Sequence, residues 1–336
     1  MSTEPILNAG NSPTEENKVV LSFVSEEYLA NSVIDLGQHL IDKTKIINKN
    51  VESLKYDDIN EYTFIKNGFQ TVLFDQDMIN KLEPIYNYSQ NLLPDVRGII
   101  DEDVLIQNCI DILQDWIKKK YTELTGEDNI TVICSRHLII RIAGCDSQSC
   151  HIPGNPLMHL DYISFDTTYD RQCKEQEKHP IPVTCPPLEQ LIDVINIWFP
   201  SGLIEDWPLG FIDTDKVEIK DYVPIQLVVG SYASSLRYKP DLRIIYKNNM
   251  RPPEVYLFRS ATKDSSKKGV IHGSFRISNQ KIQRRSIELR CLIFKNPNPN
   301  PNPNPNPNPN ENYKKYLKYK QKYSQLKLML YNKSLS

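Results

Sequence analysis

The feature that most constrains the fold is a series of eight short β-rich runs in the second part of the chain, after Asn129. These runs are Ile130–Ile133, Leu138–Ile142, Leu191–Phe199, Ile225–Val229, Leu242–Tyr246, Val255–Phe258, Val270–Ile277 and Ser286–Phe294. Loops containing Pro, Asp, Asn and Ser separate them. Short strands that follow one another without intervening helices are typical of a sandwich, barrel or jelly roll and not of a parallel α/β sheet. We therefore predict an α+β, mainly β protein with a jelly-roll core over about residues 129–295.

The N-terminal part combines one strand signal with one helical signal. Residues 1–18 are mostly polar and are predicted to be a disordered N-terminus, followed by a single domain over residues 19–295. Val19–Val24 is a β-like apolar run, whereas the apolar residues of Ser32–Ile47 recur near helical spacing. We expect a strand and then a helix.

Two further elements are predicted before the β-rich region. Asn67-Gly68 lies between Thr63–Ile65 and Gln70–Phe74, a pattern that predicts a β-hairpin. Apolar side chains recur near helical spacing over Asp101–Leu124, and Gly126 follows. A glycine just beyond the last turn is typical of a helix C-terminus, so this segment is the clearest predicted helix.

The body of the chain ends before an unusual low-complexity segment. Residues 296–310 are an uninterrupted Asn-Pro alternation that contains seven of the 23 prolines. Proline fixes φ and restricts the preceding residue, so we predict an extended, semi-rigid spacer. Residues 311–336 carry seven Lys and one Glu, with Tyr and Leu at spacings of three and four residues. They predict a short, basic amphipathic helix.

Composition excludes several classes of protein. With 40% hydrophobic and 24% charged residues, the chain is not disordered as a whole. Its apolar runs are too short for a transmembrane helix, and its N-terminus has no secretory signal pattern. The tail's charge of +6, set against −2 for the whole chain, leaves −8 for residues 1–310. We therefore expect no nucleic-acid binding by the core, whereas the basic tail can bind an anionic lipid, nucleic acid or acidic partner.

The seven cysteines form no CxxC pair. Without a secretory signal, we expect reduced thiols in an intracellular compartment. Several cysteines and two histidines gather between Cys145 and Cys185, where four of them could hold zinc. The spacings match no zinc module, and the alternative is a loop with small buried side chains.

A His-x-Asp motif carries the candidate chemistry. His159 and Asp161 open a β-like segment, and side chains two apart on a strand project from the same face. His272, on a late predicted strand, supplies a third ligand. Two histidines and one carboxylate on one face of iron leave three coordination positions open for a co-substrate and dioxygen. We predict His159, Asp161 and His272 as the metal ligands.

The last predicted strand has one fully polar face, formed by Arg284, Ser286, Glu288 and Arg290. Two interpretations remain open for it. The face can be exposed to water, as on a half-buried antiparallel strand. Alternatively it lines the mouth of a barrel, where the Arg284 guanidinium binds the carboxylate of a dicarboxylate ligand and the Ser286 hydroxyl supports it.

The order HxD, H and RxS resembles the Fe(II)/2-oxoglutarate-dependent oxygenases, whose fold is a double-stranded β-helix. Further motifs resemble the gibberellin desaturase-like and cephamycin methoxylation-related hydroxylases of secondary metabolism. They are Asn196-Ile-Trp198-Phe-Pro200, Asp206-Trp-Pro-Leu209, Asp213, Met250-Arg-Pro-Pro-Glu254-Val, Asp264-Ser265 and Arg284-Arg-Ser-Ile-Glu-Leu-Arg290. The resemblance covers roughly residues 68–294 and implies iron at the three ligands, with 2-oxoglutarate at Arg284 and Ser286 and dioxygen as the second co-substrate. Pocket candidates are Arg141, Tyr162, Asn196, Trp198 and Tyr246.

The chain departs from this family at two places. Phe199 replaces a usual arginine, and His272-Gly273-Ser274-Phe275 replaces a usual His-Thr-Ala-Phe. Neither change touches a predicted ligand, but both are expected to alter the substrate pocket. Cys173–Pro187 also has the character of a local insertion or divergent loop near the site. The substrate and the reaction outcome, hydroxylation or desaturation, therefore do not follow from the resemblance.

Two other functions stay open at this stage. The chain can be a catalytically silent jelly roll that binds partners or associates with a particle through its basic tail. It can also be a metal enzyme without 2-oxoglutarate, if Arg284 points outward. An Asn-Pro spacer before a Lys/Tyr-rich end resembles the tails of giant DNA virus proteins, which implies a viral protein in the host cytoplasm or the virion.

Overall fold

The computed structural model describes ten segments of the chain, which are residues 18–24, 33–34, 46–92, 99–100, 104–143, 157–162, 165–177, 183–227, 232–277 and 284–297. The chain divides after Asn296 into a body and a second unit, residues 297–336. All helices and strands given below belong to the body. Apart from Lys18, which begins the first strand, the predicted disordered N-terminus lies outside the described residues. The basic tail also lies outside them, as does the spacer apart from its first two residues.

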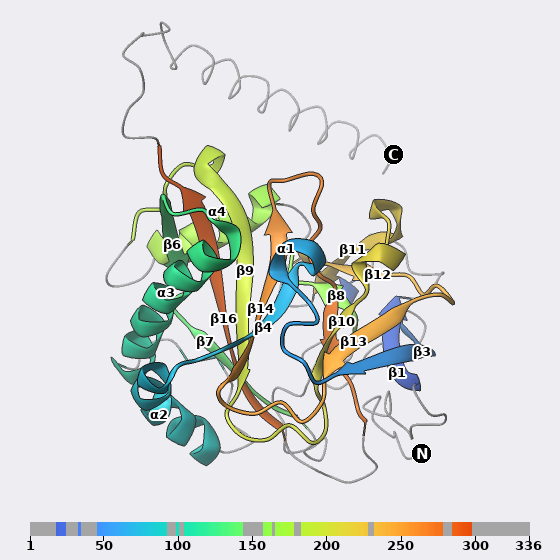
Figure 1. The fold of residues 1–336 in the computed structure, drawn as a ribbon. Coiled ribbons are helices and arrows are strands. Elements are labelled where there is room, and N and C mark those ends of the chain that lie inside the picture. Colours follow the sequence, from blue (N-terminus) through green and yellow to red (C-terminus); the bar gives the residue numbers. More distant parts are fainter. Residues whose placement is uncertain are drawn as a thin grey trace, which may run out of the picture. The chain divides into compact units, whose positions relative to one another are not determined.

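The body is mainly β and contains two sheets (Figure 1). The seven-stranded sheet has the order β4 (Phe69–Leu73), β14 (Glu254–Thr262), β9 (Leu191–Pro200), β16 (Arg284–Lys295), β7 (Leu138–Ala143) and β5 (Ile99–Ile100), with β6 (Ile130–Cys134) also paired to β16. All of its pairings are antiparallel. Its longest strands, β9 and β16, lie side by side near its centre.

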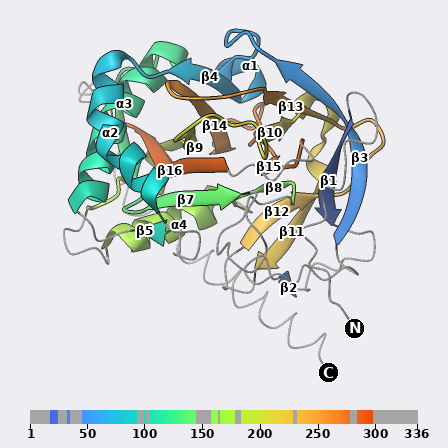
Figure 2. The same cartoon turned by 90° about the horizontal axis from the view of Figure 1, so that it is seen from below.

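The second sheet has nine strands and lies beside the first in Figure 2. Its order is β1 (Lys18–Val24), β3 (Ile46–Tyr56), β13 (Arg243–Lys247), β10 (Leu209–Ile212), β15 (His272–Ser274), β8 (His159–Leu160), β12 (Tyr232–Leu236), β11 (Tyr222–Leu227) and β2 (Val33–Ile34). Among the pairings between these described strands, β3–β13 and β2–β11 are parallel and the others are antiparallel. Aromatic side chains join the two sheets, since Phe211 of β10 packs against Tyr256 and Phe258 of β14 at ring-centroid distances of 4.9 and 5.2 Å. The predicted jelly-roll architecture is consistent with these two facing sheets.

Helices cover the outer face of the seven-stranded sheet (Figures 1 and 2). Of the described helices, α1 (Phe64–Asn67), α2 (Gln76–Asn91) and α3 (Val104–Thr125) lie on this face, whereas α4 (Phe165–Glu177) packs near the end of the opposite face, in a cluster with Leu292 and Phe294. Short 3-10 turns lie at Leu188–Gln190, Thr214–Lys216 and Ile219–Asp221. On β16, the alternate residues Ile287, Leu289 and Cys291 pack under α2 and α3 in one hydrophobic cluster. The polar residues of β16 therefore face the other sheet, because successive side chains of a strand point to opposite faces. In the described segments, no helix has the length and apolar character of a membrane span.

Most of the predicted strands coincide with observed ones, but the hairpin prediction was wrong. Residues Phe64–Asn67 form helix α1, whose N-terminus is capped by the Thr63 side chain. Gly68 then takes a left-handed conformation (φ 79°) and ends the helix before β4. Asn67 and Gly68 thus end a helix and do not form a hairpin turn. The sequence could not separate the two cases, because a left-handed glycine is common at both helix C-termini and hairpin turns.

The predicted helix over residues 101–124 matches α3, and the Gly126 amide donates to the carbonyl of Thr122. Helix α2 was not predicted, since Pro84 interrupts its pattern. The Arg285 side chain donates to the carbonyls of Ser89 and Leu92 at the end of α2. The predicted helix over Ser32–Ile47 lies largely outside the described residues; β2 and β3 occupy its two ends.

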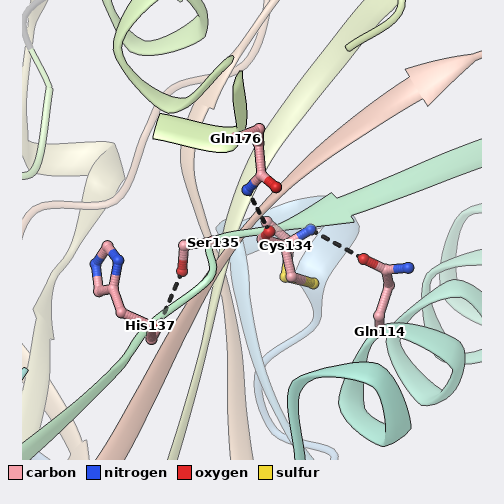
Figure 3. The surroundings of a disulfide bond; sticks show 6 residues. Gln114, Cys134, Ser135, His137 and Gln176 are labelled. Carbon is pink, nitrogen blue, oxygen red and sulfur yellow. Dashed lines mark hydrogen bonds between the residues drawn. A yellow bond between two sulfur atoms is a disulfide. The ribbon is translucent and has the colours of Figure 1, made fainter. Parts of the chain in front are cut away.

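Four cysteines in the described segments form disulfide bonds, so the expectation of reduced thiols was wrong for them. Cys134 and Cys291 are directly opposite each other in β6 and β16 and are joined by a disulfide. Figure 3 shows the Cys134 backbone held from two helices, since its amide donates to Gln114 of α3 and its carbonyl accepts from Gln176 of α4. Burial raises the pKa of the remaining described thiol, Cys109, to about 12.

The second disulfide joins Cys173 of α4 to Cys185. This bond uses two of the six candidate zinc ligands, of which the hypothesis needed four. The other candidate ligands, Cys145, Cys150, His151 and His179, lie outside the described residues. Part of the predicted divergent loop over residues 173–187 is in fact the end of α4.

The body continues one residue further than predicted, through Asn296. The Asn296 amide donates to the carbonyl of Asn129, and its side-chain oxygen accepts from the Thr131 hydroxyl at 2.7 Å. These contacts tie the end of β16 to the start of β6. The spacer therefore begins at Pro297.

Candidate metal centre

Two neighbouring strands of the nine-stranded sheet bring three metal-binding side chains together. His159 of β8 and His272 of β15 are direct partners in the antiparallel ladder, so their side chains leave the sheet on the same face. Asp161 follows His159 by two residues and projects to that face as well. All three are buried, and their ligand atoms lie within 4.8 Å of one another.

Backbone carbonyls orient both imidazole rings. The Nδ1 atom of His159 hydrogen-bonds the Leu157 carbonyl at 2.7 Å, and that of His272 hydrogen-bonds the Val270 carbonyl at 3.1 Å. Both Nε2 atoms are then turned to Asp161, each 3.8 Å from one of its oxygens. Burial, and then the nearby His272 ring, lower the pKa of His159 to about 3. The ring is therefore neutral, which is the state that binds a metal ion.

The facing sheet supplies polar partners for Asp161. Arg290 of β16 donates from Nη2 to Asp161 Oδ1 at 2.6 Å, and Asn196 of β9 donates to Asp161 Oδ2 at 2.7 Å. Glu288 accepts from both Arg290 (3.0 Å) and Asn196 (3.1 Å). Burial alone would raise the pKa of Asp161, but Arg290 and the two histidines hold it well below its usual range. The carboxylate is thus ionised and available as a ligand.

Arg284 and Ser286 lie on the same inner face of β16 and are almost fully buried. Arg284 donates from Nη1 to the carbonyl of Trp207 and to the hydroxyl of Ser274, both at 2.7 Å. Trp207 has a left-handed backbone (φ 56°), an uncommon conformation for a residue with a side chain. Nε and Nη2 of Arg284 and the hydroxyl of Ser286 have no hydrogen-bond partner within the described part of the chain. Burial, followed by the charge of Arg141, lowers the pKa of Arg284 to about 9.

The polar face of β16 is therefore not exposed to water. Arg284, Ser286 and Glu288 are each at most 6% exposed, and the Arg290 side chain is 13% exposed. Of the two interpretations left open by the sequence, the face-to-water interpretation was wrong. A cavity between the sheets is lined by Arg141, His159, Trp198, Leu209, His272, Gly273, Ser274 and Glu288.

The five pocket candidates separate into four groups, the last of which is Tyr246 alone. Arg141 and Trp198 line the cavity, and the Arg284 guanidinium lies 5.5 Å from the Trp198 ring centre. Asn196 contacts Asp161, as described above, and is a partner of the ligand. The centre of the Tyr162 ring lies 5.9 Å from the guanidinium carbon of Arg290, and the Tyr162 hydroxyl accepts a hydrogen bond from the Gln172 side chain.

Tyr246 does not line the cavity, so that prediction was wrong. It packs edge-on against Phe275 in a hydrophobic cluster with Ile244 and Phe23. Its neighbour on β13, Ile245, is the residue that packs between the two sheets. Alternation along β13 therefore turns Tyr246 to the far face of its sheet.

The two departures from the resembling family also differ in their effect. Phe199 packs against Phe74 and Tyr86 under the helices, at centroid distances of 5.4 and 5.9 Å, so it cannot shape the pocket as expected. Gly273 and Ser274 do line the cavity. Ser274 accepts a hydrogen bond from Arg284, so the second departure touches the predicted anion site.

Sequence reasoning missed the roles of Glu288 and Arg290 beside Asp161. The available signal was the strict alternation of charged residues on a strand that otherwise carries apolar side chains. The pairing of Arg290 with Asn196 depends on the register of the two central strands. That register is set when the sheet folds, so the sequence alone could not have predicted it.

Two facing β-sheets with a buried His-x-Asp and His set between them define a mainly β protein, consistent with a jelly roll, that has a candidate metal centre. The chain belongs to the family described as "YDMC: Oxidoreductase/YMDC permease-like domain", which matches residues 118–294. No curated protein matches the sequence. Among solved structures, the chain resembles "iron and alpha-ketoglutarate-dependent endoperoxidase NvfI with different conformation" with a TM-score of 0.60 at 14% identity, covering 84% of this chain and 100% of the other. A second structure, "iron and alpha-ketoglutarate-dependent endoperoxidase NvfI", gives 0.58 at 15% identity, covering 83% and 98%. At this identity the likeness establishes the fold.

Proposed function

We propose that the protein is an Fe(II)- and 2-oxoglutarate-dependent oxygenase that oxidises an unactivated C–H bond of its substrate. The observation that carries the proposal is the group of unpartnered donors on Arg284 and Ser286. Burying a guanidinium with unsatisfied N–H groups costs free energy that a bound carboxylate would recover. Arg284 contacts Ser274 and Trp198, which line the same cavity as His159 and His272.

The three candidate ligands suit ferrous iron. His159 and His272 offer neutral nitrogens and Asp161 offers an ionised oxygen, the donor set of the two-histidine, one-carboxylate centres. Their hydrogen bonds to backbone carbonyls and to Arg290 and Asn196 fix the orientation of each ligand before a metal arrives. Three protein ligands leave positions for a bidentate co-substrate and dioxygen.

The second part of the site suits a dicarboxylate. Nε and Nη2 of Arg284 form one edge of the guanidinium fork, which matches the two oxygens of a carboxylate. The hydroxyl of Ser286 can donate to the same group, and Ser274 holds the opposite side of the fork. Trp198 and Leu209 provide apolar contacts for the methylene groups between the two ends. Once bound together, iron, 2-oxoglutarate and dioxygen supply an oxidation that releases succinate and carbon dioxide.

The finer assignment rests on the substrate side of the cavity. We propose that Arg141, which lines the cavity and is only weakly paired with Glu288 (3.9 Å), faces the substrate or co-substrate. Hydroxylation and desaturation follow from the same oxidant and differ in how the substrate is held. The relation to the gibberellin desaturase-like and cephamycin methoxylation-related hydroxylases, and a viral origin of the tail, remain part of this proposal.

The test is anaerobic spectroscopy of the full chain with Fe(II) and 2-oxoglutarate. The complex should give a weak visible charge-transfer band, and admission of air should release succinate even without a substrate. His159→Ala should abolish both signals. Wild-type protein that binds Fe(II) but gives neither the band nor succinate would refute the proposal and favour a silent jelly roll or a metal enzyme without this co-substrate.

A further inference from the structure

Asp161 is held from the opposite sheet through both of its oxygens. Oδ1 accepts from Arg290 at 2.6 Å, and Oδ2 accepts from Asn196 at 2.7 Å. Asp161 itself lies just after the two-residue strand β8, in a bend. The local backbone therefore gives this side chain little support, and the two donors fix where its oxygens point.

The donors are themselves part of a closed hydrogen-bonded ring. Glu288 accepts from Arg290 at 3.0 Å and from Asn196 at 3.1 Å, and the Ser260 hydroxyl donates to the Asn196 oxygen at 2.9 Å. Arg290 and Asn196 are direct partners in the β16–β9 ladder, so their side chains lie next to each other on one face. The ring thus rests on the two longest strands of the seven-stranded sheet, which makes it a rigid support.

The charge of the ring shows what it contributes. Arg290 and Glu288 carry opposite unit charges, so together they leave the local formal charge at the −1 of Asp161. A buried arginine without Glu288 would bring an uncompensated positive charge to a metal ligand, at considerable cost. Arg290 and Glu288 together therefore provide Asp161 with a fixed hydrogen-bond donor and add no net charge of their own next to the candidate metal site.

We propose that Arg290, Asn196 and Glu288 are positioning residues that hold the Asp161 carboxylate toward both histidine Nε2 atoms. The inference rests on the proposed function, since it assigns these residues to the metal centre of that oxygenase. Partners of metal ligands orient those ligands, and their loss typically weakens metal binding about 10- to 100-fold. The positioning role requires the hydrogen bonds of the ring, whereas a purely electrostatic role would require only its charges.

Two substitutions with opposite charge effects separate these roles. Arg290→Gln removes a positive charge, and Glu288→Leu removes a negative charge together with the one oxygen, Oε1, that accepts from both Arg290 and Asn196. Under the positioning proposal, both variants weaken Co(II) binding by about 10- to 100-fold, because each opens the ring. Under electrostatics alone, Arg290→Gln binds Co(II) more tightly and Glu288→Leu more weakly, and that pattern would overturn the proposal.

The control is Arg285→Gln, the same change on the same strand but on the outer face, where Arg285 contacts the end of α2. Co(II) affinity of the full chain is measured by visible absorption, with thermal unfolding as the check on folding. Arg285→Gln should leave affinity within about 3-fold of wild type, and Arg290→Lys should recover part of the loss. At saturating Co(II), the ligand-field spectrum should change in Arg290→Gln and not in Arg285→Gln. An Arg290→Gln variant with wild-type affinity and spectrum would overturn this inference alone, whereas a wild type that binds no Co(II) would overturn the proposed function.

Discussion

Replacing Arg284 with glutamine tests the anion site directly. The guanidinium presents two unpartnered donors, Nε and Nη2, next to the unpartnered hydroxyl of Ser286. A hydrogen bond to a charged group contributes about 1.5–3 kcal/mol, and glutamine can restore one weaker bond. The expected net loss for 2-oxoglutarate is therefore about 2–4 kcal/mol, which corresponds to about 30- to 1000-fold in affinity.

The assay compares two ligands that differ in one carboxylate. 2-Oxoglutarate and 2-oxopentanoate share the metal-binding end, but only the first has the distal carboxylate that Arg284 would bind. Affinities are measured anaerobically from the charge-transfer band of the Fe(II) protein, with Arg285→Gln as the control on the outer face of the same strand. Arg284→Gln should weaken 2-oxoglutarate strongly and 2-oxopentanoate by less than about 3-fold, since the second ligand never uses the lost donors.

Two results would refute this reasoning. An Arg284→Gln variant that binds 2-oxoglutarate as wild type does would show that the unpartnered donors serve another purpose. An equal loss for both ligands would show that the substitution disturbs the whole cavity. In the second case Arg284 would be a structural residue, supported by its bonds to Trp207 and Ser274.

Three further predictions concern stability, each measured by chemical or thermal unfolding. Since burial and then His272 lower the pKa of His159 to about 3, the unfolded metal-free chain binds more protons than the folded one between that value and about 6.5. Its free energy of unfolding should thus fall with acidification below about pH 6.5, by up to about 1.4 kcal/mol per pH unit. A His159→Gln variant with the same slope would contradict this. Gly68→Ala should lower the free energy of unfolding more than Gly126→Ala does. Both glycines have positive φ (79° and 78°), but of the two only Gly68 has a side-chain atom, of Val270, 2.5 Å from the position of an added Cβ. Equal losses of stability would show that the clash relaxes. A chain ending at Asn296 should be as stable as the full chain, whereas one ending a residue earlier should lose about 1–3 kcal/mol, because the Asn296 hydrogen bonds disappear. Equal stability of the two truncations would contradict the assigned boundary.

Local patterns predicted a large part of the fold. The strands over 130–134, 191–200 and 284–295 and the helix over 104–125 have alternating or helical spacing strong enough to be recognised in sequence. Helix α2 escaped because Pro84 lies inside it, and the left-handed Gly68 suits a hairpin and a helix end equally well. The Cys134–Cys291 disulfide was missed because cysteines 157 residues apart meet only when β6 and β16 pair. Cys173 and Cys185 are only 12 residues apart, and their disulfide was missed because reduced thiols were expected.

Some features of the candidate site were also predictable from local sequence patterns. The two-residue spacing of His159 and Asp161 places both on one face of a strand, a property of the backbone that needs no tertiary information. The sequence also shows that Arg284, Ser286, Glu288 and Arg290 share one face of the last strand. Both features follow from the local alternation of side chains along a strand. In the structure, the face with His159 and the polar face of β16 are both buried between the two sheets.

Only the tertiary structure decided which residues meet across that space. The β8–β15 ladder sets His272 opposite His159, and the facing sheet brings Arg290, 129 residues along the chain, within 2.6 Å of Asp161. It also turned Tyr246 and Phe199 away from the cavity, although their types and positions suited a pocket. The reason is that alternation fixes which side chains share a face. Which face becomes the interior is fixed by the pairing of distant strands and the burial of the helices against one sheet.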